Sequence, residues 1–246
     1  MRARSIRRWI SKIRKLPLHP QWLVAVSGED RMLAAALGTL SGRVLDIGCT
    51  DRRLAALLPS GCEYIGLDYP DTAVTMYHTR PDVFADARGL PFPTASFQGV
   101  IFKDVLEHVP GPEAALREVG RVLQAGGHLV LWIPFLYPIH DAPHDFQRYT
   151  EHGLQEYLRR CGLRVVELEP VLTPMETSAL LTCLALGDAA EQILERRLWL
   201  APLLPVLALL VLSANLWGKA LSWLPASRFM PAFYRLMAVR EAAGPQ

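Results

Sequence analysis

The sequence predicts an α/β fold: a doubly wound, mostly parallel, Rossmann-like sheet with helices on both faces, plus an apolar helical C-terminal extension. Short apolar runs alternate with amphipathic segments between residues 29 and 170, which is typical of parallel strands joined by helices. Several of these runs end in an aspartate. After residue 170 the apolar runs lengthen and acids become few, which predicts the extension.

The elements follow from these runs in chain order. A helix is expected at 112–123 because Leu116, Val119 and Val122 share one side, and Gly162 ends another helix at 150–161. The glycine-containing turn at 125–127 precedes a strand. The expected strands are residues 43–48, 63–68, 82–85, 97–102, 127–133 and 163–168, and a further helix begins at 52–58.

Length and composition limit the class of protein. A chain of 246 residues can build a core of its own but is short for two full-size enzyme domains. Because 51% of the residues are hydrophobic, general disorder is excluded. Four cysteines stand far apart without a CxxC pair, which argues against a disulfide scaffold or a cysteine zinc site and for reduced thiols in the cytosol: Cys49, Cys62, Cys161 and Cys183.

Three segments are expected: a basic amphipathic arm at 1–28, an α/β domain at 29–170 and the apolar extension at 171–246. The arm has seven positive charges before Glu29, the first acid. Its apolar residues Ile6, Trp9, Ile10, Ile13 and Leu16 recur at helical spacing, which suits an anionic membrane surface, although a solvated basic tail is the alternative. Because the excess of basic over acidic residues is confined to this arm, no nucleic-acid partner is expected.

Carboxylates follow the first three strands of the expected sheet. In an open α/β sheet, ligands bind beyond the carboxyl ends of the strands, where Asp46, Asp68 and Asp86 would gather. An acid after the second strand, such as Asp68, suits the two hydroxyls of a ribose. Gly48 permits close approach of a ligand to the backbone. No GxGxxG motif is present, which argues against a nicotinamide dehydrogenase.

Three stretches of sequence carry a family resemblance: VLDIGCTDRRLAALLP, YIGLDYP, and ADARGLPFPTASFQGVIFKDVLEHVPGPEAALREVGRVLQAGGHLVLWIPF. Over roughly residues 43–135 the chain resembles class I S-adenosylmethionine (SAM)-dependent methyltransferases of the type 11 family. The resemblance implies methyl transfer with SAM as cofactor. It also implies that the cofactor site contains Asp46, Gly48 and Cys49 along the methionine part, Asp68 at the ribose, Asp86 and Ala87 at the adenine, and Lys103 in the pocket.

The chain departs from the family's Asp-x-Gly-x-Gly-x-Gly pattern at two positions. Thr50 and Arg52 replace the second and third glycines. Their side chains would crowd the methionine end of the site, or Arg52 would pair with the carboxylate of SAM. A methyltransferase-like binding or scaffold protein without turnover therefore remains an alternative.

The loop at 134–150, PFLYPIHDAPHDFQRYT, is the expected substrate site. His140 or His144 is the expected general base for a hydroxyl or amine acceptor, and Arg148 is suited to a phosphate or carboxylate. The alternative is a purely structural loop that caps the next helix through Thr150. The predicted substrate residues are Tyr137, His140, His144, Asp145, Arg148 and Tyr149.

Two further interpretations concern the same loop. HDAPHD supplies two histidines and two aspartates, but Pro143 interrupts the helical spacing of a histidine pair, so no metal is expected. The loop also resembles that of bacterial methyltransferases linked to surface polysaccharide and lipid-linked glycan assembly. That resemblance implies a membrane-proximal lipid or glycan acceptor, and the possible bases in the loop favour O-methylation.

No charged residue lies between Arg197 and Lys219. This segment could span a bilayer once, lie in the interface as a helical hairpin continued by Trp223, Phe229 and Phe233, or pack as a buried helix or a homodimer interface. Basic residues flank both ends, which favours the interfacial arrangement. The protein is therefore expected at the cytoplasmic face of a membrane, as a peripheral or monotopic protein.

Overall fold

The computed structural model describes residues 14–242, which form two compact units. The sheet unit comprises residues 30–135, 139–169 and 233–242, and the helical unit comprises residues 14–29, 136–138 and 170–232. Of the expected helix of the basic arm, Ile6, Trp9, Ile10 and Ile13 lie outside the described residues, and Leu16 lies in a bend and not in a helix.

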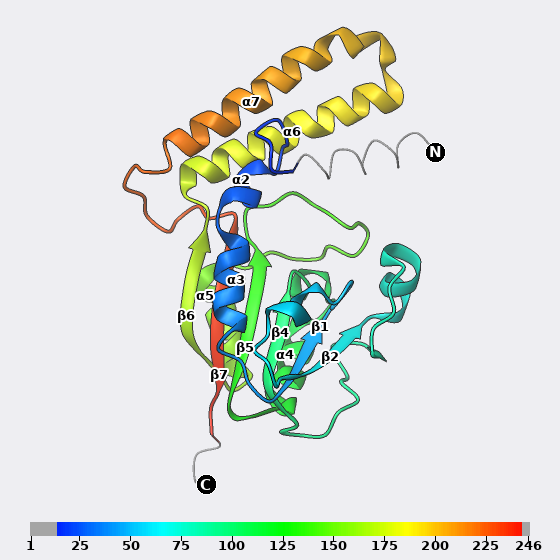
Figure 1. Ribbon diagram of the computed structural model, residues 1–246, viewed down its shortest axis with the longest axis vertical. Coiled ribbons are helices and arrows are strands. Elements are labelled where there is room, and N and C mark those ends of the chain that lie inside the picture. The colour runs from blue at the N-terminus through cyan, green and yellow to red at the C-terminus, as the bar shows by residue number, and fades with distance from the viewer. Residues whose placement is uncertain (1–13, 243–246) are drawn as a thin grey trace. The chain divides into compact units, whose positions relative to one another are not determined.

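The sheet has seven strands in the order β3-β2-β1-β4-β5-β7-β6 (Figure 1). The pairs β2–β3, β1–β2, β1–β4 and β4–β5 are parallel, and β7 runs antiparallel to β5. This arrangement confirms the predicted fold class. The strands are β1 (Arg43–Ile47), β2 (Glu63–Asp68), β3 (Val83–Phe84), β4 (Phe97–Lys103), β5 (Leu123–Pro134), β6 (Leu163–Val171) and β7 (Phe233–Arg240).

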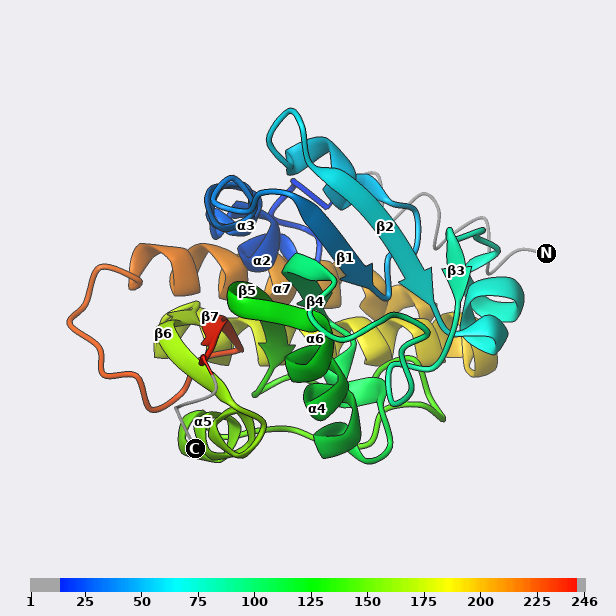
Figure 2. The same ribbon diagram turned by 90° about the horizontal axis from the view of Figure 1, so that it is seen from below.

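Helices cover both faces of the sheet, as the fold class requires. In Figure 2, α3 (Glu29–Leu37) lies on one side, and α4 (Pro112–Val122) and α5 (Glu151–Arg160) lie on the other. The predicted apolar side of α4 is its buried side, since Leu116, Val119 and Val122 are fully buried. The central strands are buried on both faces, which explains why they read as continuous apolar runs.

Short turns of helix follow several strands and shape the edge at which the strands end. The helix expected at 52–58 is a 3₁₀-helix, η1 (Arg53–Leu57). Two others are the π-helix η2 (Thr72–Tyr77) after β2 and the 3₁₀-helix η3 (Leu106–His108) after β4. These turns place side chains of neighbouring strands at one edge of the sheet.

Residues 233–240 differ from the expected helical extension, because they form strand β7 between β5 and β6. Its centre is buried, including Arg235, which is 6% exposed. The guanidinium of Arg235 lies 2.6 Å from the carboxylate of Glu169 and also pairs with Glu167. Two acids on the neighbouring strand thus compensate the charge that breaks the apolar pattern of β7.

The helical unit contains α2 (Trp22–Val26), α6 (Pro174–Arg196), the 3₁₀-helix η4 (Leu198–Leu203) and α7 (Leu204–Ala220). Helices α6 and α7 lie side by side (Figure 1), and Gly218 is in close contact with α6 because an added Cβ would lie 2.5 Å from that of Ala179. The buried amide of Asn215 donates to the carbonyls of Pro17 at 2.7 Å and His19 at 3.0 Å. The segment before α2 is therefore held against α7.

A large apolar surface lies on α7 and its neighbours. Leu198–Ala220 is the one helical segment of the described chain that is long and apolar enough to cross a membrane. Most of it is uncovered: Trp199 is 77% exposed and Leu209 is 61% exposed. Within this single chain it is therefore not the buried helix that was one of the three sequence alternatives.

Candidate active site

The loop after β1 turns through left-handed backbone conformations. Gly48 has φ +77°, and a Cβ at this position would lie 2.2 Å from a methyl carbon of Val105. Thr50 and Arg52, which stand where the family has glycine, also have positive φ, at 42° and 60°. The N–H groups of Gly48 and Cys49 both donate to the carbonyl of Leu67, at 2.8 and 3.1 Å. The loop thus keeps a glycine-like path and is tied to the end of β2.

Two carboxylates lie beside this loop. Asp68 accepts hydrogen bonds from the N–H of Thr50 at 3.1 Å and of Tyr69 at 2.8 Å. Burial nevertheless raises the pKa of Asp68. Asp46 is also buried and accepts the hydroxyl of Tyr64 at 2.7 Å. Burial raises the pKa of Asp46 to about 7; the bond from Tyr64 lowers it, and the charge of Asp68 raises it further.

Two other residues of the same loop, Arg52 and Cys49, differ in their surroundings: Arg52 forms an ion pair and Cys49 is buried. The guanidinium of Arg52 pairs with Asp82 and lies 5.2 Å from the centre of the Tyr64 ring. It is therefore directed to Asp82 at the beginning of β3. Cys49 is buried, and burial together with the charges of Asp46 and Asp68 raises the pKa of its thiol to about 12, which keeps it protonated.

The remaining predicted cofactor residues lie near the ends of β3 and β4. Asp86 follows β3 and is paired with Arg88 at 2.6 Å, which lowers the pKa of Asp86. Ala87 is buried in the apolar core. Lys103 ends β4, pairs with Asp104 and lies 5.6 Å from the centre of the Trp132 ring. All three residues lie at the carboxyl edge of the sheet.

Three residues of the predicted substrate loop come together in the sheet unit. The carboxylate of Asp145 accepts the backbone N–H of His140 at 3.0 Å and the guanidinium of Arg148 at 2.7 Å. Burial would raise the pKa of Asp145, but these two donors lower it to about 2. The Nδ1 atom of His140 lies 3.3 Å from Asp145 and 3.4 Å from Arg148. The imidazole of His140 is therefore held by a carboxylate that stays ionised.

The other three loop residues have different surroundings. The carbonyl of His144 accepts a hydrogen bond from Nδ1 of His108 at 2.9 Å. Tyr149 is buried against Tyr157 in the apolar core, and burial raises the pKa of its hydroxyl. Tyr137 belongs to the helical unit, where its hydroxyl accepts the amide of Gln21 at 2.5 Å. The structure therefore does not gather all six residues at one place.

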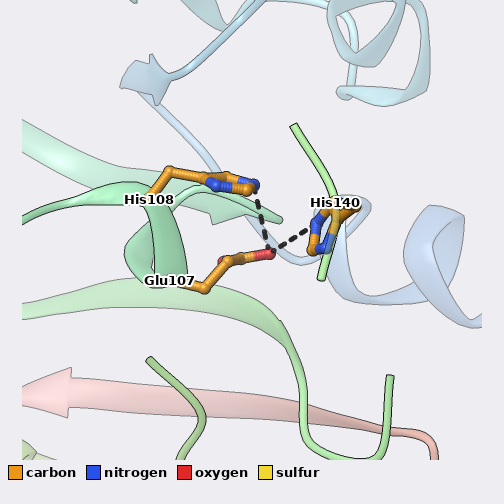
Figure 3. Close-up of side chains that lie close together, drawn as sticks. All are labelled: Glu107, His108 and His140. Atoms are coloured by element: carbon orange, nitrogen blue, oxygen red, sulfur yellow. Dashed lines mark ion pairs between the residues drawn. The ribbon is translucent and has the colours of Figure 1, made fainter. Parts of the chain in front are cut away.

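One cluster was not foreseen as a unit. Glu107 is 0% exposed, and its Oε1 atom lies 3.7 Å from Nε2 of both His108 and His140 (Figure 3). Burial raises the pKa of Glu107. The sequence signal is the LEHV stretch that follows the end of β4, where Glu107 and His108 are adjacent. Burial of the glutamate was not visible in that pattern.

Tyr77, also not foreseen, connects this cluster with the cofactor edge. Its hydroxyl donates to Asp141 at 2.8 Å, next to His140 in the chain. Burial raises the pKa of Tyr77, and so do the hydrogen bond to Asp141 and the charges of Asp141, Asp68 and Glu107. Asp68 at the end of β2 and Glu107 after β4 thus both raise the pKa of the Tyr77 hydroxyl.

Comparison with known proteins agrees with this geometry. Residues 45–131 match the family described as "Methyltransferase domain". The chain is 28% identical over 202 residues to O-methyltransferase resE of Aspergillus sclerotiorum, covering 70% of this chain and 75% of that protein. It is 32% identical over 164 residues to 27-O-demethylrifamycin SV methyltransferase of Amycolatopsis mediterranei, covering 56% and 60%. The second alignment spans less than two thirds of the relative.

Solved structures share the fold. The [4+2]-cyclase SpnF has a TM-score of 0.57 at 21% identity, covering 87% of this chain and 82% of that one. A Haemonchus contortus N-methyltransferase, solved with S-adenosylhomocysteine, has a TM-score of 0.50 at 15% identity, covering 94% and 59%. Residues 45–131 thus match a methyltransferase domain, the chain shares its fold with these solved structures, and the match supports S-adenosylmethionine as the cofactor.

Proposed function

We propose that this protein methylates a hydroxyl oxygen of a lipid or lipid-linked glycan at the cytoplasmic face of a membrane. The observation that carries the proposal is the uncovered apolar surface of α7 on a chain that also has a methyltransferase domain. A soluble protein rarely leaves an apolar surface of this kind without a partner. Transfer to oxygen is supported by the names of the two relatives, both of which denote O-methyltransferases.

The residues at the ends of β1 and β2 fit the cofactor. Each carboxylate oxygen of Asp68 accepts one backbone N–H, which leaves a lone pair on each for a ribose hydroxyl. Asp46 is a buried carboxylate whose raised pKa reflects burial, and the ammonium group of SAM would supply a countercharge. Gly48 keeps the backbone open where a side chain would meet Val105. Asp86 and Ala87, after β3, are assigned to the adenine side.

Transfer to a hydroxyl requires loss of its proton. When bound, SAM supplies a methyl group that is already activated on a sulfonium. The protein must therefore position the acceptor oxygen and promote loss of its proton. Of the two histidines predicted from sequence, His140 has the supporting contacts, since Asp145 holds it and Glu107 faces its Nε2 atom. We assign this task to the cluster of Glu107, His108 and His140.

The cofactor assignment is tested by calorimetric titration of the purified protein with SAM and S-adenosylhomocysteine. Asp68→Ala should weaken the binding of both ligands by at least about tenfold, because the two ribose hydroxyls lose their acceptor. Asp30→Ala, which removes an exposed aspartate in α3, is the matched control and should bind like wild type. Equal affinity in wild type and Asp68→Ala would contradict the assignment.

The membrane assignment is tested by flotation with vesicles of anionic and neutral phospholipids. The triple variant Val206→Ser, Leu209→Ser, Leu210→Ser removes exposed apolar side chains from α7 and should float several-fold less. Val166→Ser, at an exposed apolar position of β6, is the control and should float like wild type. A wild-type dimer that does not float, and that the triple variant makes monomeric, would instead identify α7 as a homodimer interface.

A second candidate function is binding at the membrane without methyl transfer. The observation that favours it is the replacement of two glycines by Thr50 and Arg52, which leaves side chains in the loop after β1. Incubation of the protein with radiolabelled SAM and membrane extracts distinguishes methyl transfer from binding without transfer. Incorporation of label into an extractable lipid or glycan supports the enzyme, whereas cofactor binding without incorporation favours the second function.

A further inference from the structure

The carboxylate of Glu107 is an unusual group for the interior of a protein. Its side chain is completely buried, and within residues 14–242 neither oxygen accepts a hydrogen bond. A buried carboxylate that accepts no hydrogen bond destabilises the folded state, because it has lost its hydration without compensation. Such groups are retained where something else compensates them.

Two imidazole nitrogens face this carboxylate. Nε2 of His108 and Nε2 of His140 each lie 3.7 Å from the same oxygen, Oε1 (Figure 3). This distance is too long for a hydrogen bond. It is close to the separation of two ligands on one metal ion, because bonds of about 2.0–2.1 Å at tetrahedral angles place ligand atoms about 3.4 Å apart. The three ligand atoms all lie within 4.8 Å of one another.

The opposite nitrogens of both rings have polar partners: Nδ1 of His108 faces a carbonyl, and Nδ1 of His140 lies between Asp145 and Arg148. Nδ1 of His108 lies 2.9 Å from the carbonyl of His144, and since a carbonyl can only accept, the proton is on Nδ1 and the lone pair is on Nε2. Nδ1 of His140 lies 3.3 Å from the ionised carboxylate of Asp145. Histidines that bind metals are typically oriented in this way, by a carbonyl or a carboxylate behind the ring.

We propose that Glu107, His108 and His140 bind one divalent transition-metal ion of the zinc type. Two imidazoles and one carboxylate are a recurring ligand set for catalytic zinc, which keeps a coordination position open. The sequence led to the expectation of no metal because it paired His140 with His144. The structure instead pairs the ring of His140 with residues of η3 and uses the backbone of His144 behind His108.

The metal has a defined task, which rests on the proposed function. Its open position takes the acceptor hydroxyl and lowers the pKa of that group, so that the proton leaves to bulk water. The resulting oxygen then forms a bond to the methyl carbon while the bond from carbon to sulfur breaks, and the sulfonium becomes a neutral thioether. With the metal bound, His140 is a ligand and not the base, and Asp145 positions it.

Metal binding is measured directly, without an activity assay. The full chain is freed of metal with a chelator and titrated with Co²⁺, whose visible absorption reports its ligands, and with Zn²⁺ by calorimetry. We expect one ion per chain and at least tenfold weaker binding in Glu107→Gln and in His140→Gln. His152→Gln, at an exposed histidine of α5, should bind like wild type.

Two outcomes would overturn the inference: wild type that binds no stoichiometric Co²⁺ or Zn²⁺, or variants that bind them as tightly as wild type. Circular dichroism and SAM titration of Glu107→Gln show whether the variant is folded. Unchanged SAM affinity then ties the lost metal binding to the ligand itself. Failure of the proposed function is separate, since it would leave metal binding intact while no methyl group reaches any acceptor.

Discussion

At the residue scale, the proposed contact of Asp46 with the cofactor predicts that cofactor binding depends on pH. Burial raises its pKa to about 7 in the free protein. If the ammonium group of SAM lies beside it, as proposed, binding favours the ionised form and releases the proton. Affinity therefore falls as the pH drops through 7. Between pH 7.5 and pH 6.0 the dissociation constant should rise roughly eightfold, as measured by calorimetry.

Asp46→Asn is the control for this effect. The amide does not titrate, so affinity in this variant should be weaker but constant over the same range. Titrations in buffers of different ionisation enthalpy should show proton release for wild type and none for the variant. A wild-type affinity that does not change between pH 6.0 and pH 7.5 would show that Asp46 lies away from the cofactor's charge.

Sequence reasoning placed Asp68 and Asp46 well because it followed a topological rule. The carboxyl ends of parallel strands lie at the same edge of the sheet, and this follows from the topology without any detail of side-chain packing. Glu107 was different. Its burial depends on the loop after β5, where the N–H of Phe146 donates to the carbonyl of Glu107 at 3.0 Å and the amide of Gln147 donates to that of Val109 at 2.8 Å. The path of such a loop is a tertiary property that the sequence pattern does not reveal.

At the element scale, α6 depends on its first turn. The hydroxyl of Thr173 accepts the N–H of Glu176 at 3.3 Å, and the carboxylate of Glu176 accepts the N–H of Thr173 at 3.0 Å. This capping box satisfies helix N–H groups that have no partner within the helix. Thr173→Ala should lower the free energy of unfolding by about 1 kcal/mol, measured by urea denaturation.

The matched control is Thr182→Ala in the interior of the same helix. The hydroxyl of Thr182 is exposed and donates only to the carbonyl of Ser178, at 2.9 Å. Its loss should change the unfolding free energy by less than about 0.5 kcal/mol. Equal destabilisation by both variants would mean that the box at the start of α6 contributes nothing specific.

The strands that were predicted and the strand that was missed differ in how their residues are buried. β1 and β4 are buried by the sheet's own helices, so an apolar run was sufficient evidence. β7 has a charged residue, Arg235, at a buried position, which interrupts the apolar pattern of a buried strand. Only its neighbours Glu167 and Glu169 on β6 make that position tolerable. A single sequence does not show which strands are adjacent.

At the scale of the whole molecule, β7 should be essential for the sheet. It lies between β5 and β6, and it pairs with β5 over residues from Phe233 to Val239. A chain ending at Ala232 would leave the backbone groups of both neighbours without partners. We expect such a chain to lack cooperative unfolding and to aggregate, as monitored by near-ultraviolet circular dichroism and size-exclusion chromatography.

A chain ending at Ala242 is the control, because it retains β7 and the N–H of Glu241 that donates to the carbonyl of Gly162 at 3.0 Å. It should unfold cooperatively like wild type. Cooperative unfolding of the shorter chain would mean that β5 and β6 can close the sheet without β7.

The position of β7 in the chain also sets an order of events during synthesis. The apolar helices α6 and α7 are made before residues 233–240, yet the sheet cannot be completed until those residues have left the ribosome. The apolar helices α6 and α7 are therefore available to a bilayer while the sheet unit is still incomplete. If α7 docks on the membrane at this stage, the sheet unit completes its fold at the bilayer, which is where the proposed function puts the acceptor.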